Sequence, residues 1–155
     1  MAPLVQIFLP YPDFQQTMAC LDTMRLRQQR TDAMKILQGV EPTLGSATPW
    51  FNERAAHLWR EHARALMLYY DLSLKEYIRR GFRNHLQFCL HEYMHHQDKV
   101  PMPFFIGDEA FHRSHQSRLV QLDPEHYRKY FPDVPDNLPL VWPKQNVINL
   151  KGETL

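Results

Sequence analysis

The stretch LDTMRLRQQR, residues 21–30, sets the pattern from which the rest of the chain can be interpreted. In an α-helix, Asp22, Arg25 and Gln29 fall at i, i+3 and i+7 and therefore share one stripe. Leu26 lies on a neighbouring face that can meet a core. Two interpretations are open. The stripe is either a solvated face with an i,i+3 ion pair worth about 0.2–0.5 kcal/mol, or a working surface of carboxylate, guanidinium and amide.

The size and composition of the chain are those of an ordinary globular protein. Its 155 residues suffice for one core but hardly for two, so residues 1–155 are expected to form a single domain. Hydrophobic residues make up 44% and charged residues 23% of the chain. The formal net charge is only +1, so no overall basic field attracts nucleic acid. A polyanionic partner would have to be held by a local basic patch.

The cysteines and the N-terminal residues indicate a reducing compartment. Cys20 and Cys89 are far apart and outside any CxxC pattern, so buried free thiols are expected rather than a disulfide framework. The apolar residues 4–9 have no basic segment before them and run into Pro10 and Pro12, unlike a signal peptide or a membrane span. We therefore expect a cytoplasmic protein, associated with the nucleoid if it binds DNA.

Apolar periodicity and capping residues predict a mainly α protein. Asp13 and Asp108 are suitable N-caps, and Gly81 is a suitable residue to end a helix. The prolines of the tail, residues 132–155, favour an extended strap over the surface. Three principal helices are predicted at residues 14–37, about 50–80 and 109–122, with shorter ones at 85–97 and from 124.

Residues 91–95, HEYMH, fit the H-E-x-x-H pattern of zinc hydrolases. On a helix, the two imidazoles would bind zinc and Glu92 would act as base for a metal-bound water. This short pattern arises by chance in a chain with nine histidines. No third ligand follows His95 at a set spacing, and Pro101 interrupts the helix. We therefore prefer a polar helix near the surface and predict no metal site.

Residues 112–118, HRSHQSR, are a second candidate for chemistry. On a helix, His115 and Arg118 share one stripe, and His112 and Gln116 lie one turn apart on another. Donors of this kind suit phosphates and base edges. The two histidines could also bind a metal, but no carboxylate or thiol accompanies them at a convincing spacing. The segment favours contact with a polyanion over a solvated face.

Basic residues gather on the three principal helices. If these faces converge, a near-neutral protein would still have a basic groove whose affinity for nucleic acid depends strongly on salt. The aromatic residues Trp50, Trp59, Tyr69 and Tyr70 are expected in the core rather than as stacking platforms. The basic residues are Arg25, Arg27, Arg30 and Lys35 on the first helix, Lys75, Arg79, Arg80 and Arg83 at the end of the second, and Arg113 and Arg118 on the third.

Taken in order, these landmarks resemble the pyrimidine-dimer DNA glycosylase family of the endonuclease V type, above all its bacterial members. The resemblance spans most of the chain apart from residues 85–103, and it implies a compact, mainly α domain with three principal helices. The matching motifs are residues 7–14 (IFLPYPDF), the D-x-x-R-L-x-x-Q-R of residues 22–30, Arg80-Gly81-Phe82, residues 112–119 (HRSHQSRL) and the Pro-rich residues 131–143.

The resemblance implies that the N-terminal α-amine is the nucleophile, here that of Ala2 once Met1 is removed. The amine attacks C1′ of the damaged nucleotide, expels the base and leaves an imine, which permits β-elimination of the 3′ phosphate. An α-amine suits this role because its pKa near ~8 leaves a neutral fraction at neutral pH. By position, Asp22 is the carboxylate that supports the cationic transition state. The expected DNA contacts are Arg25, Gln29, Arg30, His57, His112, Arg113, His115, Gln116 and Arg118.

The expected activity is removal of a damaged or modified pyrimidine from double-stranded DNA, alone or with AP lyase activity, by a monomer without a cofactor. Two alternatives remain open. The first is a non-catalytic module that binds DNA lesions. Two features favour it: Gln6 stands where the phage member of the family has a basic residue, and residues 1–4 precede the first motif. The second is a small zinc metalloenzyme that uses His91, Glu92 and His95.

Overall fold

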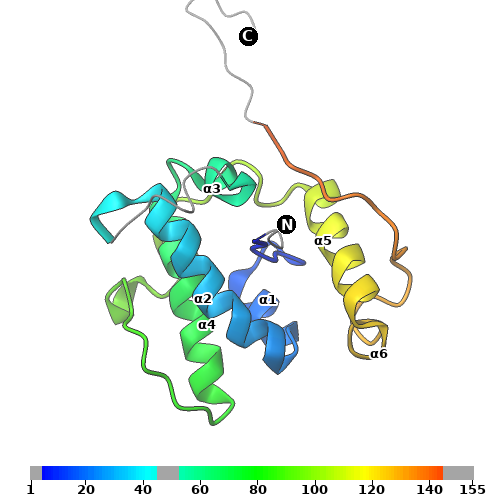
Figure 1. Cartoon of the computed structure of the whole chain (residues 1–155), viewed down its shortest axis with the longest axis horizontal. Coiled ribbons are helices and arrows are strands. Elements are labelled where there is room, and N and C mark those ends of the chain that lie inside the picture. The colour runs from blue at the N-terminus through cyan, green and yellow to red at the C-terminus, as the bar shows by residue number, and fades with distance from the viewer. Residues whose placement is uncertain (1–4, 45–52, 145–155) are drawn as a thin grey trace, which may run out of the picture.

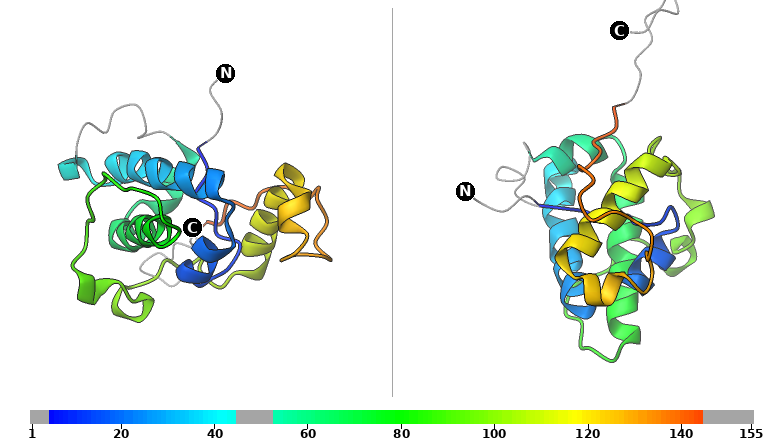
Figure 2. Two further views of the ribbon diagram at one scale, coloured as in Figure 1. Left: turned by 90° about the horizontal axis from the view of Figure 1, so that it is seen from below. Right: turned by 90° about the vertical axis from the view of Figure 1, so that its right-hand side faces the viewer.

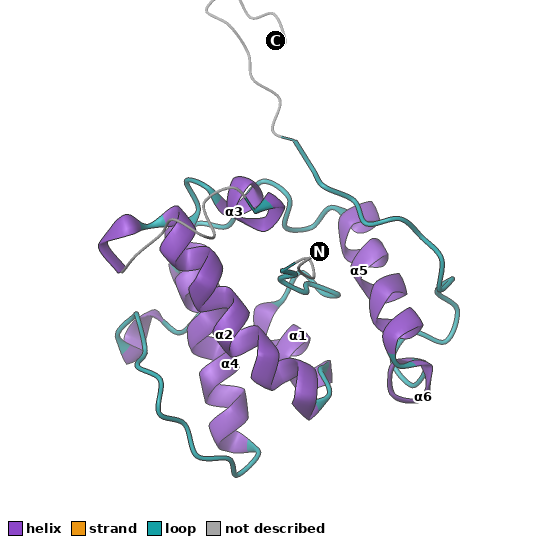
Figure 3. Ribbon diagram, in the orientation of Figure 1, coloured by secondary structure: helices purple, strands orange, loops and turns teal. Residues whose placement is uncertain are grey.

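The computed structural model describes residues 5–44 and 53–144, and six α-helices lie within them. Short 3-10 turns at Pro42–Leu44, Glu92–Met94 and Gln97–Lys99 are the other regular elements of these two ranges, which contain no β-strand. The prediction of a mainly α protein is therefore confirmed (Figure 3). The helices are α1 (Phe14–Cys20), α2 (Thr23–Val40), α3 (Arg54–Trp59), α4 (Ala63–Arg79), α5 (Glu109–Leu122) and α6 (Pro124–Tyr127).

The first predicted helix, residues 14–37, is two helices in the structure. Asp13 caps α1 as predicted. The chain then becomes extended at Leu21 and Asp22, with ψ angles of 137° and 155°. Asp22 is the N-cap of α2, because its carboxylate accepts a backbone N–H of the first turn. The expectation that Asp22 lies on the helical stripe is wrong, since it stands directly in front of that stripe.

The second predicted helix also divides. α3 ends at Trp59 and α4 begins at Ala63, with Glu61 between them at φ 73°, a conformation that non-glycine residues rarely adopt. α4 ends as predicted, because Gly81 takes φ 95° after its last turn. The predicted helix at residues 85–97 is wrong, since this stretch is a loop that contains only 3-10 turns.

α2 and α4 pack side by side, and α1 lies against α4 (Figure 1). One hydrophobic cluster takes residues from all six described α-helices. The predicted core positions Trp59, Tyr69 and Tyr70 are at most 2% exposed and belong to this cluster. Trp50 lies outside the described residues. Other fully buried members include Phe14 of α1, Leu26 of α2 and Leu66 of α4.

Residues 6–10, the clamped segment, run between α2 and α5 (Figure 1) and are held there by side chains of both helices. Gln29 of α2 accepts one backbone N–H of the segment and donates to one carbonyl, both at 2.8 Å. From α5, His115 accepts an N–H, while His112 and Gln116 donate to carbonyls, each at 2.8 Å. These bonds take the place of a paired strand, because every buried backbone group needs a partner. The bonded backbone groups belong to Gln6, Phe8, Leu9 and Pro10.

Residues 132–144, the strap, run back along α5 without regular structure, as Figure 2 shows. The N–H of Leu138 donates to Oγ of Ser117 at 3.0 Å, and the N–H of Val141 donates to Oγ of Ser114 at 3.1 Å. Later strap residues thus bond earlier helix residues, so the strap is antiparallel to α5. The rest of the predicted tail, residues 145–155, lies outside the described residues. Within residues 5–44 and 53–144, no helix has the length and apolar character to span a membrane.

Candidate functional site

Asp22 lies at the junction of α1 and α2, where its carboxylate is held by two residues. Its Oδ2 accepts the backbone N–H of Arg25 at 3.3 Å, and its Oδ1 accepts Nη1 of the same arginine at 3.1 Å. The hydroxyl of Tyr127 in α6 donates to Oδ1 and accepts the N–H of Asp22 at 3.0 Å. Partial burial by itself would raise the pKa of Asp22, but the bonds from Tyr127 and Arg25 outweigh it and hold the pKa below its ordinary value. Asp22 is therefore an ionised carboxylate at neutral pH.

Arg80 fixes the same junction from the end of α4. Its guanidinium donates to the carbonyls of Met18 and Leu21 at 3.0 and 2.7 Å, which satisfies acceptors that the end of α1 leaves without helical partners. It also bonds Oγ1 of Thr23 at 3.2 Å and Glu76 at 2.9 Å. The sequence motif Arg80-Gly81-Phe82 predicted a helix end but did not reveal this role. The role of Tyr127 was missed as well, since its partner is 105 residues away.

The α2–α5 groove is a cavity of about 660 Å³, and its lining includes Arg25, the ion-pair partner of Asp22. Arg25 and Gln29 line it from α2, Arg118 and Leu122 from α5, and Leu138 from the strap. Basic residues of the first and third predicted helices therefore converge, which the sequence had left open. The basic end of α4 does not contribute to the lining. The groove places two guanidinium groups on opposite walls. The carboxylate in its lining is that of Asp32, whereas Asp22 pairs with Arg25 from outside the lining.

Four predicted DNA contacts are the side chains that hold the clamped segment. Gln29, His112 and His115 are at most 3% exposed, and Gln116 is half-buried. Burial lowers the pKa of His115 to about 3, and burial also lowers the pKa of His112 even though a bond to a carbonyl opposes the shift. Both imidazoles are therefore neutral at pH 7 and are occupied by backbone groups. Contact of these four residues with DNA stays a prediction, and it would require them to leave their present partners.

The other predicted site residues that the structure describes do not gather in the α2–α5 groove. Arg30 is 9% exposed, its Nη1 donates to Asn84 at 3.0 Å, and its guanidinium lies 3.9 Å from the ring centroid of Tyr77. Arg113 is exposed on α5 and lines neither cavity described for this molecule. His57 is exposed on α3 and lines a second cavity, away from Arg25 and Arg118. Ala2, the expected source of the nucleophilic amine, lies outside the described residues.

The H-E-x-x-H stretch does not have the helical geometry that a zinc site of this kind needs. Glu92 to Met94 form a 3-10 turn, and Glu92 accepts Nζ of Lys75 at 2.7 Å. His91 is exposed, whereas His95 is buried with its Nε2 2.9 Å from a carboxylate oxygen of Asp71. Within residues 5–44 and 53–144, no group of three or more His, Cys, Asp or Glu residues could hold a metal ion. The helical premise of the zinc interpretation is therefore wrong.

Both cysteines are free, as predicted. Cys20 is buried, but Cys89 is only half-buried, so the prediction of two buried thiols is correct for the first alone. Burial raises the pKa of Cys20 to about 12 and that of Cys89 to about 11. Neither thiol is ionised at neutral pH, so neither is a candidate nucleophile.

Comparison with known proteins agrees with the sequence motifs that lie before residue 89. A family model described as pyrimidine dimer DNA glycosylase matches residues 5–89. The matched region contains α1 to α4, with Asp22, Arg25 and Arg80, and ends before α5. No curated protein and no solved structure matches the chain. Because the matched residues are more than half of the 155 in the sequence, the chain belongs to the pyrimidine dimer DNA glycosylase family.

Proposed function

We propose that this protein is a DNA repair glycosylase that removes a damaged or modified pyrimidine, with Asp22 and the α2–α5 groove as its active site. The observation that carries the proposal is that the ionised carboxylate of Asp22 pairs with Arg25, which lines a groove that has Arg118 on its other wall. Family membership supplies the reaction class, and the groove supplies a place for it. The chain is proposed to act as a monomer on double-stranded DNA and without a cofactor.

Asp22 would stabilise positive charge on the deoxyribose as the bond from C1′ to the base breaks. A carboxylate held below its ordinary pKa suits this role, because it remains charged beside a developing cation. Arg25 and Tyr127 keep it fixed in place, so little reorganisation is needed when the sugar becomes cationic. The same carboxylate can move a proton to or from the attacking group.

The proposed nucleophile is the α-amine of Ala2. Its attack on C1′ expels the base, and the sugar opens to an imine whose β-elimination breaks the bond to the 3′ phosphate. Gln6 lines the groove, so the N-terminal chain arrives there. Ala2 is three residues ahead of Val5, a separation that extended chain covers in at most about 10 Å. If the amine does not attack, Asp22 would activate a water, and base release would occur without the lyase step.

Arg25 and Arg118 would hold phosphates on either side of the target nucleotide. Each lies on a wall of the groove, and Arg118 is exposed. Replacing Arg118 by Ala should weaken binding and lower the slope of log K against log salt by about one. Lys129→Ala is the matched control, because Lys129 is an exposed cation that lines neither cavity.

The test uses the full chain with duplexes that carry an ultraviolet photoproduct or a chemically modified pyrimidine, with and without borohydride. Base release together with a covalent adduct on the N-terminal peptide is the expected result. Release without an adduct would assign the hydrolytic route through Asp22. Absence of base release from every duplex at low salt would refute the enzyme proposal.

One observation favours a second candidate, a module that binds lesions without cutting. The oxygens of Asp22 already accept bonds from the backbone N–H and the guanidinium of Arg25 and from the hydroxyl of Tyr127. The same bonds would be present if Asp22 only fixed the junction of α1 and α2. This candidate predicts salt-dependent binding to damaged duplex that survives Asp22→Asn, with no turnover by either protein. Turnover by the wild-type chain that the substitution abolishes would exclude it.

A further inference from the structure

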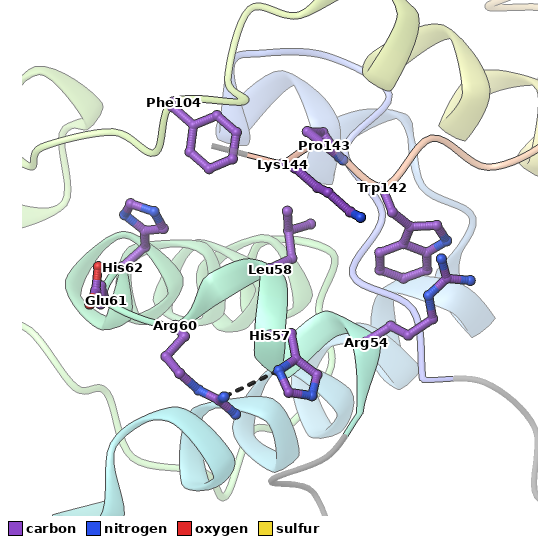
Figure 4. A pocket seen from close by; sticks show the side chains of 10 residues that line it. All are labelled: Arg54, His57, Leu58, Arg60, Glu61, His62, Phe104, Trp142, Pro143 and Lys144. Carbon is purple, nitrogen blue, oxygen red and sulfur yellow. Dashed lines mark hydrogen bonds between the residues drawn. The ribbon is translucent and has the colours of Figure 1, made fainter. Parts of the chain in front are cut away.

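A second cavity, the α3 cavity of about 510 Å³, lies between α3, the link from α3 to α4, Phe104 and the end of the strap (Figure 4). The proposed reaction uses none of its residues. Its lining contains the cations Arg54, Arg60 and Lys144 but only one carboxylate, that of Glu61. His57 adds a ring nitrogen that Nη1 of Arg60 approaches at 3.1 Å, as the dashed line in Figure 4 marks. This charge balance favours an anionic ligand.

Aromatic side chains stand at two ends of the same cavity (Figure 4). At one end, the guanidinium of Arg54 lies 4.7 Å from the ring centroid of Trp142. At the other end, Phe104 is 43% exposed, and its ring centroid is 6.1 Å from that of His62. Leu58 lies between the two ends. Accessible aromatic surface among cations is the combination with which proteins bind single-stranded nucleic acid, by stacking bases and neutralising phosphates.

The strap connects this cavity to the proposed active site. Leu138 and Leu140 line the α2–α5 groove, whereas Trp142 and Lys144 line the α3 cavity. Four residues of extended chain, from Leu140 to Lys144, span at most about 14 Å. A DNA strand that leaves the groove along the strap therefore reaches the α3 cavity directly.

We propose that the α3 cavity binds an unpaired nucleotide of the DNA strand held in the α2–α5 groove, with its base on Trp142 and its phosphate on Arg54 and Arg60. The inference rests on the proposed function for the presence of that strand. A paired base is covered on both faces by its neighbours, so only an unpaired nucleotide offers a base face and a phosphate together. Duplex phosphates alone would use the cations and leave the aromatic surface without a partner. The site would make the protein prefer lesions that lie next to unpaired DNA.

The test measures direct binding of the full chain to two DNA probes. One is a fully paired duplex with a photoproduct, and the other carries about five unpaired nucleotides next to the same lesion, within the reach of single-strand sites. Trp142→Ala should weaken binding to the second probe by about tenfold, and it should change binding to the first by no more than about twofold. Trp142→Phe keeps a stacking face and should retain most of the affinity. Arg54→Gln should weaken the salt dependence on the second probe only.

Lys129→Ala serves again as the charge control, and thermal unfolding by circular dichroism verifies that each variant is folded. Equal weakening on both probes, or no weakening by Trp142→Ala and Arg54→Gln on either, would overturn the proposal. Base release is measured separately on the paired duplex. A wild-type chain that binds the second probe through Trp142 but releases no base would refute the glycosylase proposal and leave the α3 cavity assignment intact.

Discussion

Asp22 and Asp71 are carboxylates in two parts of the molecule that accept similar bonds in different surroundings. Asp22 stands at the start of α2 beside the α2–α5 groove, with its side chain 16% exposed. Asp71 is in the middle of α4, and its side chain has no exposed area. It accepts the N–H groups of Cys89 and Leu90, both at 2.7 Å, and Nε2 of His95 at 2.9 Å.

The surroundings shift the pKa values of the two carboxylates in opposite directions. For Asp71, burial dominates and raises the pKa even though three hydrogen bonds oppose the shift. For Asp22, bonds from Tyr127 and Arg25 outweigh a smaller burial, so the pKa falls. Asp71 therefore attaches the loop of residues 83–100 to α4, while Asp22 keeps its charge where a ligand can reach it. Accessibility, rather than the number of bonds, distinguishes the candidate catalytic carboxylate.

The strongest test of this contrast is Asp22→Asn. Asparagine is as good an N-cap as aspartate, so the free energy of unfolding should fall by no more than about 1 kcal/mol. Base release should fall by about 10²- to 10⁴-fold, because the amide cannot carry the charge or move the proton. Single-turnover base release and urea unfolding of the same preparations measure the two effects. A variant that keeps wild-type rates would make Asp22 as structural as Asp71.

Asp71→Asn should have the opposite effects, a large loss of stability and little change in base release. The amide group would point a donor at N–H groups that now reach a carboxylate, which leaves buried donors unpaired in α4 and its loop. The free energy of unfolding should fall by about 3 kcal/mol, while base release per folded molecule stays near that of the wild type. Asp136→Asn, at an exposed strap position, is the matched control and should be close to neutral. Loss of turnover without loss of stability would break the contrast.

Much of the helical order could be predicted from local signals. Asp13, Asp108 and Gly81 mark helix ends where the sequence placed them. The two helix breaks could not be predicted in the same way, because the residues on both sides of each break favour helix. The break before Asp22 is stabilised by Tyr127 and by Arg80, and no spacing rule connects these residues to it.

The candidate site was predictable to a similar degree. The sequence left open whether the basic helix faces converge, and the structure brings Arg25 and Arg118 to one groove. The histidines of α5 were assigned to DNA from their residue type alone, yet His115 bonds the backbone of Leu9, 106 residues away. Such a partner is a main-chain group, so no residue type in the sequence marks it. Trp142 escaped notice for a related reason, because its cavity exists only where the strap meets α3.

Tyr127→Phe tests how the surroundings of Asp22 set its pKa, and its effect should be smaller than that of either aspartate substitution. Removal of the hydroxyl deletes one bond to the carboxylate and one to the backbone N–H of Asp22, at a cost of about 1 kcal/mol in the free energy of unfolding. The pKa of Asp22 should rise, since this bond is the foremost influence that lowers it. Carboxyl-carbon NMR titration follows the pKa directly. Tyr130→Phe, on an exposed neighbour, should leave it unchanged.

The smallest expected effect is a difference in how stability depends on pH. The pKa of Asp22 is lower in the folded chain than the unfolded value of about 3.9, so its contribution is present above that pH and is lost as the pH falls through the folded pKa. The pKa of Asp71 is raised by folding, so its contribution is complete below about pH 3.9 and is lost as the pH rises through the folded pKa. Urea unfolding between about pH 3 and pH 6 should therefore show the stability advantage of wild type over Asp22→Asn growing with pH. The advantage over Asp71→Asn should shrink over the same range. Slopes of equal sign would mean that the two carboxylates share one kind of environment, and the distinction between a site residue and a loop anchor would fail.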